Sequence, residues 1–407
     1  MAVELAPHQL KAINELSNGK ILCGGVGVGK SRTALAYYFL KDCGGSLKIN
    51  GEGATGKMAD PKPLYIITTA KKRDNLDWVD ECAPFCLSRD PESSFEGLAV
   101  TIDSWNNLKK YSEVRGAFFI FDEQRLVGSG AWVKAFLKIV KQNNWILLSA
   151  TPGDTWMDFV PVFIANGFYK NKTEFVRRHV VYSNFSKFPK IDHYVEQGRL
   201  QRFRLSLLVD MPYQRTTVRH RHAVLVDYDP DLYETVVKKR WNPYKDEPIK
   251  DVGQLGYVAR RVLNSDPSRL EAVKAIAGDY DKIILFYNFN YELDALRTLG
   301  DNPEITVAEW NGHKHEPVPP TERWIYLVQY SSGAEGWNCT DTNCIVFYSL
   351  NYSYRLMHQS EGRIDRLNTP YTDLHYYTFR SLAGLDKAIT KSVKSKQDFN
   401  QKAFFKF

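Results

Sequence analysis

The sequence is poor in cysteine and contains no long apolar run. Its six cysteines are scattered over 407 residues, which argues against a framework of disulfide bonds and is typical of a reducing compartment. No stretch approaches the roughly 18 uninterrupted apolar residues of a membrane-spanning helix. The opening residues MAVELAPHQLKA lack the basic and then apolar pattern of a secretory signal. Heptad and low-complexity repeats are also absent. These absences exclude a disulfide-stapled secreted domain and a coiled coil, and we expect a cytoplasmic protein without a membrane partner.

What the chain does contain is the composition of a folded globular protein. Hydrophobic residues make up 43% of it and charged residues 25%, both within the usual range. A chain of this length exceeds what one ordinary hydrophobic core accommodates, so we expect two domains.

Positive charge is concentrated in two segments. Residues 170–222 hold twelve Lys or Arg against four Asp or Glu, and residues 387–407 hold six Lys against Asp398 alone. Since the net charge of the chain is +7, the remainder is acidic by about six charges. Such segments favour a polyanionic partner, because neutralising phosphates drives sequence-independent binding to nucleic acid. An ordinary solvated surface is the alternative for both segments.

Apolar strands alternate with helical segments in two series. The strands expected in the first series are 21–23, 64–69, 98–102, 117–121 and 145–149. Those expected in the second are 223–226, 283–287, 305–308, 324–328 and 345–348. Strands separated by helices indicate an α/β fold with parallel sheets covered on both faces. We expect a first domain over 1–165, a basic helical extension and linker over 166–220, a second domain over 221–384 and a basic tail over 385–407.

A glycine-rich run carries the first functional signal. Residues 24–31 (GGVGVGKS) fit the pattern G-x-x-x-x-G-K-[ST], with the strand 21–23 before them and a helical segment, 32–40, after them. In such a loop the backbone N–H groups wrap phosphates, the lysine reaches the β- and γ-phosphates, and the hydroxyl ligates Mg²⁺. An ordinary glycine-rich turn is the alternative, which the flanking strand and helix disfavour. The run predicts a nucleoside triphosphate site, with these residues: Gly25, Gly27, Gly29, Lys30, Ser31 and Arg32.

Two acids end an apolar strand about ninety residues further on. The segment 117–124 reads AFFIFDEQ. In nucleotide hydrolases with such a loop, an Asp at a strand end holds Mg²⁺ and an adjacent Glu polarises the attacking water. The pattern therefore predicts Ser31 and Asp122 as metal ligands and Glu123 as the residue that activates water. A strand that merely ends in solvated acids is the alternative.

Further motifs follow in a fixed order. Residues 147–152 read LLSATP, 332–340 read SGAEGWNCT and 358–366 read HQSEGRIDR. Together with the glycine-rich run and the acids, they resemble the motifs of the superfamily two helicases and translocases. Gln9, in the segment LAPHQ, resembles the glutamine that reads adenine in that superfamily, and VTIDSW at 100–105 resembles a motif that tracks DNA.

Three details resemble the Swi/Snf-type translocases within that superfamily. They are W-x-x-E at 78–81, the segment KIILFYNF at 282–289, and G-W-N-C-T at 336–340. The sequence departs from the pattern where Cys23 precedes the glycines, where Arg125 follows Gln124, and after Arg366, where the usual Gly-Gln is missing. With no chromatin-reading module, the chain resembles a reduced version of bacterial or phage type, for which replication or recombination is the expected setting.

The resemblance implies two tandem RecA-like P-loop NTPase domains that bind ATP and Mg²⁺ and couple hydrolysis to movement along DNA. It implies catalysis by Lys30, Asp122, Glu123, Arg363 and Arg366, where the two arginines stabilise charge on the γ-phosphate. Structural ion pairs are the alternative for these arginines. It implies nucleotide contacts from Gln9 and Asn338. It implies that four residues link the nucleotide to domain closure: Gln124, Ser149, Thr151 and Gln359.

Contacts with nucleic acid are expected from Lys71, Lys72, Trp105 and Trp337. Tryptophans in such motifs also fill hydrophobic cores, and the two lysines also suit a solvated loop, so both interpretations stay open. An RNA helicase of the same architecture, a DNA-binding module gated by ATP, and the motor subunit of a nuclease complex are alternative functions. No nuclease motif is present, so a cleaving subunit would be a separate partner protein.

Overall fold

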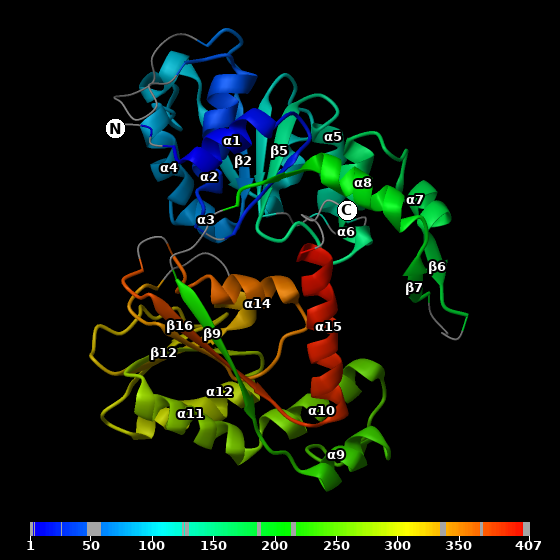
Figure 1. Cartoon of the computed structure of the whole chain (residues 1–407), viewed down its shortest axis with the longest axis vertical. Coiled ribbons are helices and arrows are strands. Elements are labelled where there is room, and N and C mark those ends of the chain that lie inside the picture. The colour runs from blue at the N-terminus through cyan, green and yellow to red at the C-terminus, as the bar shows by residue number, and fades with distance from the viewer. Residues whose placement is uncertain are drawn as a thin grey trace. The chain divides into compact units, whose positions relative to one another are not determined.

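The computed structural model describes residues 3, 5–25, 27–46, 58–123, 126, 130–184, 189–212, 217–333, 339–366 and 369–401, with side chains up to residue 397. The chain divides into two compact units, the first comprising Met1–Tyr213 with Asp398–Phe407 and the second Gln214–Gln397. Each unit is built around one six-stranded sheet (Figure 1). None of the described helices is long and apolar enough to cross a bilayer.

The sheet of the first unit is parallel throughout, in the order β3-β2-β4-β5-β1-β8. Its strands are β1 (Ile21–Cys23), β2 (Leu64–Thr68), β3 (Val100–Ser104), β4 (Phe118–Asp122), β5 (Asn144–Ser149) and β8 (Leu208–Asp210). Its helices include α1 (Pro7–Glu15), α2 (Lys30–Tyr37), α3 (Ala70–Asp74), α4 (Asp77–Cys82), α5 (Ala131–Ile139) and α6 (Trp156–Ala165). Alternate residues of β4 enter different cores, Ile120 one and Phe121 the other. Both faces of the sheet are therefore buried, as expected for parallel strands.

The second unit repeats this architecture with the order β13-β14-β12-β15-β16-β9, again all parallel. Its strands are β9 (Val218–Leu225), β12 (Lys282–Tyr287), β13 (Thr306–Trp310), β14 (Trp324–Gln329), β15 (Cys344–Phe347) and β16 (Asp373–Arg380). Its helices are α9 (Pro230–Val237), α10 (Val252–Asn264), α11 (Pro267–Asp279), α12 (Asn290–Arg297), α13 (Tyr330–Gly333), α14 (Tyr354–Glu361) and α15 (Gly384–Gln401), and β10 (Trp241–Asn242) pairs with β11 (Glu247–Pro248). The predicted fold of two tandem RecA-like α/β domains is confirmed.

The region expected as a helical extension and linker holds more regular structure than its composition suggests. It contains α7 (Lys172–His179), the antiparallel strands β6 (Val180–Tyr182) and β7 (Ile191–Tyr194), α8 (Gln197–Leu207) and β8. Strand β8 pairs with β1, so this region completes the first sheet. Strand β9 begins inside the same region but pairs with β16 over eight residues in the second sheet. Along the chain, the division between the two units falls between residues 213 and 214. The expected boundaries at 165 and 220 differ from this position.

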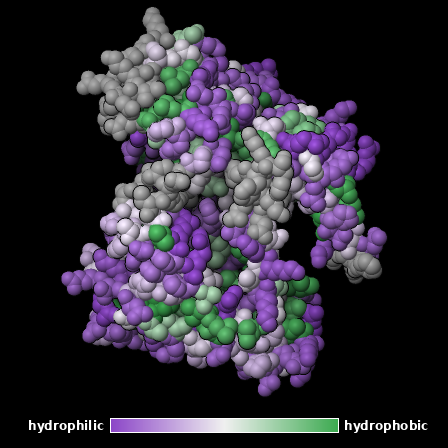
Figure 2. Space-filling view, viewed as in Figure 1, coloured by the Kyte–Doolittle hydropathy of each residue, from purple (hydrophilic) through white to green (hydrophobic). Residues whose placement is uncertain are grey.

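The β6–β7 hairpin extends away from the first sheet (Figure 1), and aromatic side chains pack together near its base. Phe168 stacks on Phe203 with 4.3 Å between ring centroids, and the ring of buried His179 bonds to the Tyr169 hydroxyl at 2.6 Å. Figure 2 shows apolar side chains at the surface near the hairpin; Val181 of β6 and Val195, directly after β7, are exposed. The basic composition of this region gave little sign of a hydrophobic core. The aromatic contacts at the base of the hairpin supply one.

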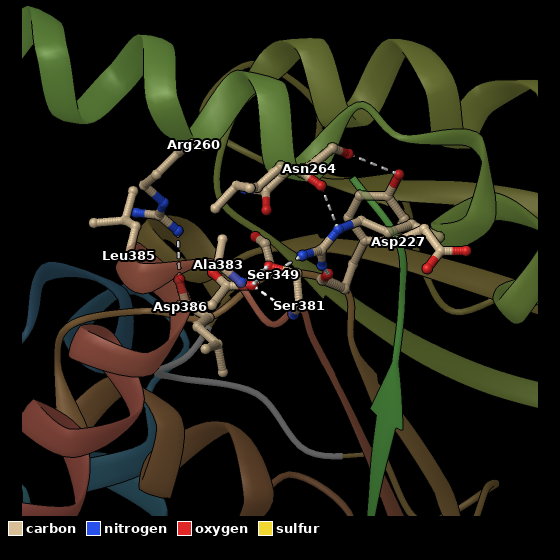
Figure 3. Close-up of polar contacts among 12 residues, drawn as sticks. Asp227, Arg260, Asn264, Ser349, Ser381, Ala383, Leu385 and Asp386 are labelled. Carbon is tan, nitrogen blue, oxygen red and sulfur yellow. Dashed lines mark hydrogen bonds and ion pairs between the residues drawn. The ribbon is translucent and has the colours of Figure 1, made fainter. Parts of the chain in front are cut away.

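Residues 385–401 of the expected basic tail belong to helix α15, whose first turn is fastened to the second unit by a buried ion pair; residues 402–407 lie outside the described residues. Arg269 lies 3.3 Å from Asp386, which also accepts hydrogen bonds from the backbone and hydroxyl of Ser381 at 2.8 and 2.9 Å. Figure 3 shows the polar side chains that gather here from α10, from the segments that follow β15 and β16, and from the start of α15. Three lysines of this helix, Lys387, Lys391 and Lys394, are exposed. The tail therefore packs on the second unit through its first turn and keeps its charge at the surface.

Candidate active site

The predicted site residues of the first unit meet at one edge of its sheet. Strands β1, β2, β4 and β5 end at Cys23, Thr68, Asp122 and Ser149. In the register of the sheet, Cys23 is level with Ser149, and Asp122 with Leu148. The carboxyl ends of parallel strands share an edge, which is where open α/β sheets bind ligands.

The glycine-rich loop needs its glycines for two reasons. Gly27 and Gly29 have φ values of +85° and +80°, a region that side chains with a Cβ disfavour. A Cβ on Gly29 would also lie 2.3 Å from the side-chain amide nitrogen of Gln9. Only glycine fits here, and helix α2 begins at the next residue.

Lys30 starts helix α2 and turns its ammonium back onto the loop. Its Nζ donates to the carbonyl oxygens of Gly24 and Gly25, each at 2.8 Å. Burial lowers the pKa of Lys30 to about 8, although the charges of Glu123 and Asp122 oppose this shift. A half-buried ammonium beside the N–H groups of a helix N-terminus is an anion-binding arrangement.

Gln9, expected to read adenine, is bonded to the glycine-rich loop. Its amide nitrogen donates to the carbonyl of Gly29 at 3.1 Å, and its amide oxygen accepts from the N–H of Ala6 at 2.7 Å. The nitrogen end of this buried amide thus holds α1 to the loop, while its oxygen end caps the start of α1 itself. The adenine contact stays a prediction, and the structure adds a positioning role that the sequence did not suggest.

Asp122 lies buried at the end of β4 and is the centre of a hydrogen-bond cluster. Its Oδ2 accepts from the hydroxyl of Thr68 at 2.8 Å, the ammonium of Lys72 at 2.9 Å and the indole N–H of Trp78 at 3.0 Å. Burial by itself would raise the pKa of Asp122, but Lys72 and these hydrogen bonds outweigh it and lower that pKa. The carboxylate is therefore ionised at neutral pH.

Glu123 follows with an unusual backbone. Its φ is +58°, in the left-handed region where a residue with a Cβ carries about 1–3 kcal/mol of strain. Its Oε1 lies 3.4 Å from Nζ of Lys72. Such strain is characteristic of functional sites. Gln124 and Arg125 lie outside the described residues.

Lys72 was expected to contact nucleic acid, but its ammonium is bound to the two acids instead. Burial would lower the pKa of this lysine, and the charges of Asp122 and Glu123 more than offset that and raise it. The reason lies in α3, which begins directly after β2 and so places Lys72 beside the end of the neighbouring strand β4. Lys71 is half-buried on the same helix, and its contact with nucleic acid stays a prediction.

The expectation that Trp105 stacks on bases does not agree with its burial. Its side chain is 2% exposed, its ring stacks on Phe121 with 5.5 Å between centroids, and its N–H donates to the carbonyl of Asp122 at 2.9 Å. The ring belongs to the core that supports β4. Trp337 and Asn338 lie outside the described residues.

The Trp and the Glu of the W-x-x-E segment at 78–81 both contact residues of the candidate site. Trp78 donates to Asp122, as described above, and Glu81 pairs with Arg32 of α2 at 3.3 Å. Arg32 was expected to contact nucleotide, and in this conformation it joins α2 to α4. One turn of α4 thus braces both the acid and the helix after the glycine-rich loop.

Ser149 and Thr151 lie between the loop and the acids. The backbone N–H of Gly24 donates to the carbonyl of Ser149 at 3.3 Å, and the N–H of Thr151 donates to the Ser149 hydroxyl at 3.1 Å. Both residues are buried. The Thr151 hydroxyl has no hydrogen-bond partner among the described residues. The predicted linking role stays a proposal, but the placement suits it.

In the second unit, the predicted arginines follow helix α14. Arg363 is buried, and its Nε donates to the carbonyl of Gln359 at 3.0 Å. Gln359 is buried as well, and Arg366 is half-buried. Their roles toward a nucleotide stay predictions.

The sequence analysis did not predict the ion pairs that surround the segment 358–366. Arg219 on β9 donates to Asp365 at 2.7 Å and to Glu361 at 3.2 Å, and Arg221 donates to Glu361 at 2.8 Å. The expected linker ended at 220, inside the run RHRH at 219–222. Its alternation was the available signal, because period-two spacing places the two arginines on one face of a strand.

No protein-family model matches the chain, and no curated protein matches it. Solved structures similar to it include the SWI2/SNF2 ATPase core of Sulfolobus solfataricus in complex with dsDNA. That likeness has 14% sequence identity and a TM-score of 0.41, and covers 98% of this chain and 92% of that chain. At this level of identity, function has to be argued from the side chains of this chain.

Proposed function

We propose that this protein is an ATP-dependent motor that hydrolyses ATP in its first unit and moves along DNA. The observation that supports this most is the meeting of Lys30, Asp122 and Glu123 at one edge of a parallel sheet, next to a loop built from glycines with positive φ. An anion-binding helix start beside two acids suits the phosphates of a nucleotide and the cation that accompanies them.

The residues present fit Mg²⁺ as that cation. Magnesium prefers oxygen ligands, and here the hydroxyl of Ser31 and the carboxylate of Asp122 supply them in our proposal. The orphaned hydroxyl of Thr151 shows that this edge has polar capacity that the described protein groups leave unused. Mg²⁺ bound between phosphate and protein would neutralise charge that develops on the phosphate oxygens.

The chain's own groups then perform defined tasks. Glu123 accepts a proton from the attacking water, and Lys30 stabilises negative charge on the β- and γ-phosphates. Arg363 and Arg366 add positive charge to the γ-phosphate from the second unit. Gln9 and Asn338 contact the nucleoside, while Ser149, Thr151, Gln124 and Gln359 transmit the state of the nucleotide to domain closure. The two arginines make hydrolysis depend on both units, which is what a motor requires.

DNA as the track is supported by surface charge together with the motif resemblance. Exposed cations are distributed along the basic segment of the first unit, namely Lys170, Arg177, Arg178, Lys190 and Arg202. Helix α15 adds the three exposed lysines named above. Phosphates of a nucleic acid backbone are the polyanion that such a surface neutralises without regard to sequence. Replication, recombination or a nuclease complex are settings in which such a motor would have protein partners.

The test is steady-state ATP hydrolysis measured without nucleic acid and with single-stranded DNA, duplex DNA or RNA, with Lys30→Ala as the control. We expect stimulation chiefly by duplex DNA and loss of activity in the variant. A preference for single strands would favour an unwinding helicase. Stimulation by RNA alone would refute the choice of DNA, and no hydrolysis under any condition would favour an ATP-gated binding module.

A further inference from the structure

One ammonium group is bound by both acids of the candidate active site. Nζ of Lys72 lies 2.9 Å from Oδ2 of Asp122 and 3.4 Å from Oε1 of Glu123. The side chain of Lys72 is 24% exposed and that of Asp122 only 3%. Because the pair is largely shielded from solvent, its charges act on one another more strongly than they would at a surface.

The hydrogen bonds to Oδ2 of Asp122 leave that oxygen little room for another positive group. Its Oδ2 already accepts from Thr68, Lys72 and Trp78, which is more than the two lone pairs of one carboxylate oxygen provide for. A metal ion that takes this oxygen must displace a donor. Thr68 and Trp78 are held in the core at 0% and 2% exposure. Lys72 is the donor that can leave, since its ammonium sits on a flexible four-carbon stem.

The charges around Asp122 lead to the same conclusion. Glu123 and Asp122 both act on Lys30 as well as on Lys72, and the two lysines act on each other with the opposite sign. Two ammonium groups thus face two carboxylates. A divalent cation beside Asp122 would be repelled by Lys72 for as long as that ammonium stayed in place.

We propose that Lys72 is a tethered cation that competes with the divalent metal for Asp122 and Glu123, so that binding of a metal–nucleotide complex releases its ammonium from the acids. The proposal rests on the function proposed above, because it assumes a metal–nucleotide site at this edge. Release would return the charge of Lys72 to α3, beside Lys71 and Arg73. Occupancy of the nucleotide site would thereby change the positive charge available on that helix.

The experiment is equilibrium binding of a fluorescent ADP analogue to the full chain during a titration with Mg²⁺, which requires no hydrolysis. Lys72→Met should lower the Mg²⁺ concentration for half-maximal binding about tenfold, the ratio that corresponds to one pKa unit of charge interaction. Lys72→Arg keeps the charge and should stay within about threefold of the wild type. Arg73→Met is the matched control, because it removes one positive charge from the same helix. Arg73 pairs with Asp74 and Asp103 and not with the two acids of the site.

An unchanged or higher Mg²⁺ requirement in Lys72→Met, with wild-type binding intact, would overturn the competition and leave the proposed function standing. Absence of ADP binding by the wild type at every Mg²⁺ concentration would refute the proposed function itself. Thermal melting of each variant shows whether it is folded. If Lys72→Met does not fold, Lys72→Gln with the same titration decides between the outcomes.

Discussion

The two units share a sheet architecture but differ at the edge where the strands end. In the first sheet this edge carries charge, with Lys30, Lys72, Asp122 and Glu123 in one cluster. In the second sheet the corresponding strands β12 and β15 run into Asn288 and Ser349, whose side chains bond to each other at 2.7 Å. The comparison teaches that the fold provides the edge and that the side chains at the strand ends determine whether it can bind a charged ligand.

A buried acid at the second edge is bound by groups of the protein itself. Glu292 is fully buried and accepts hydrogen bonds from the backbone N–H of Asn288 at 2.7 Å, from Asn264 at 2.7 Å and from Ser349 at 2.9 Å. Burial raises the pKa of Glu292, against the effect of these donors. Such a hydrogen-bonded acid stabilises α12 on its sheet. The acids of the first edge, by contrast, are held by a cation on a movable stem.

The largest effect is expected from Glu123→Gln. The substitution removes the proposed general base and keeps the size of the side chain, so hydrolysis should fall about 10²- to 10⁴-fold. Nucleotide affinity should stay within a few-fold of the wild type. Both are measured by steady-state hydrolysis and by equilibrium binding of fluorescent ADP. Hydrolysis at the wild-type rate would assign the base to another residue.

The matched substitution at the second edge is Glu292→Gln. It leaves part of a buried hydrogen-bond network unsatisfied, so it should lower the free energy of unfolding by about 1–3 kcal/mol. Hydrolysis by the folded protein should change far less than in Glu123→Gln. Urea unfolding monitored by circular dichroism gives the stability. A loss of hydrolysis as large as that of Glu123→Gln, in protein that is still folded, would remove the contrast between the two edges.

Arg269→Met tests the anchoring of α15. It should affect stability, whereas Glu123→Gln should affect hydrolysis. It leaves the buried carboxylate of Asp386 without its cation, which typically costs about 3–5 kcal/mol. We expect the free energy of unfolding to fall by that amount. The effect on hydrolysis should again be smaller than that of Glu123→Gln. Asp386→Asn in the Arg269→Met background removes the unpaired charge and should recover part of the lost stability. If no stability is recovered, the loss in Arg269→Met comes from packing and not from the unpaired charge.

The smallest effect concerns pH. Burial lowers the pKa of Lys30 to about 8, so its ammonium, which attracts phosphate, loses its proton as the pH rises through that value. Affinity for ADP should therefore fall above pH 8, by at most about tenfold per pH unit. Lys30→Arg keeps its charge throughout, and its weaker binding should be flat over the same range. An equal pH dependence in both proteins would point to another titrating group.

The sequence predicted the sheets and the centre of the site because those signals are local. A buried strand that ends in Asp122, and a loop whose φ values require glycine at Gly27 and Gly29, can be recognised from neighbouring residues. Strands β8 and β16 and the pairing of β9 were missed because each depends on residues far along the chain. Lys72 and Trp105 were assigned to nucleic acid for the same reason. Only the register of β2, β3 and β4 brings them to Asp122.

The most direct test of the contrast between the two edges is the stoichiometry of ATP binding to the full chain. Titration calorimetry with a non-hydrolysable ATP analogue and Mg²⁺ should give one site per chain for the wild type, and binding should be lost in Lys30→Ala. Two sites per chain, or one site that survives Lys30→Ala, would contradict the account, because nucleotide would then bind somewhere other than the charged edge of the first sheet.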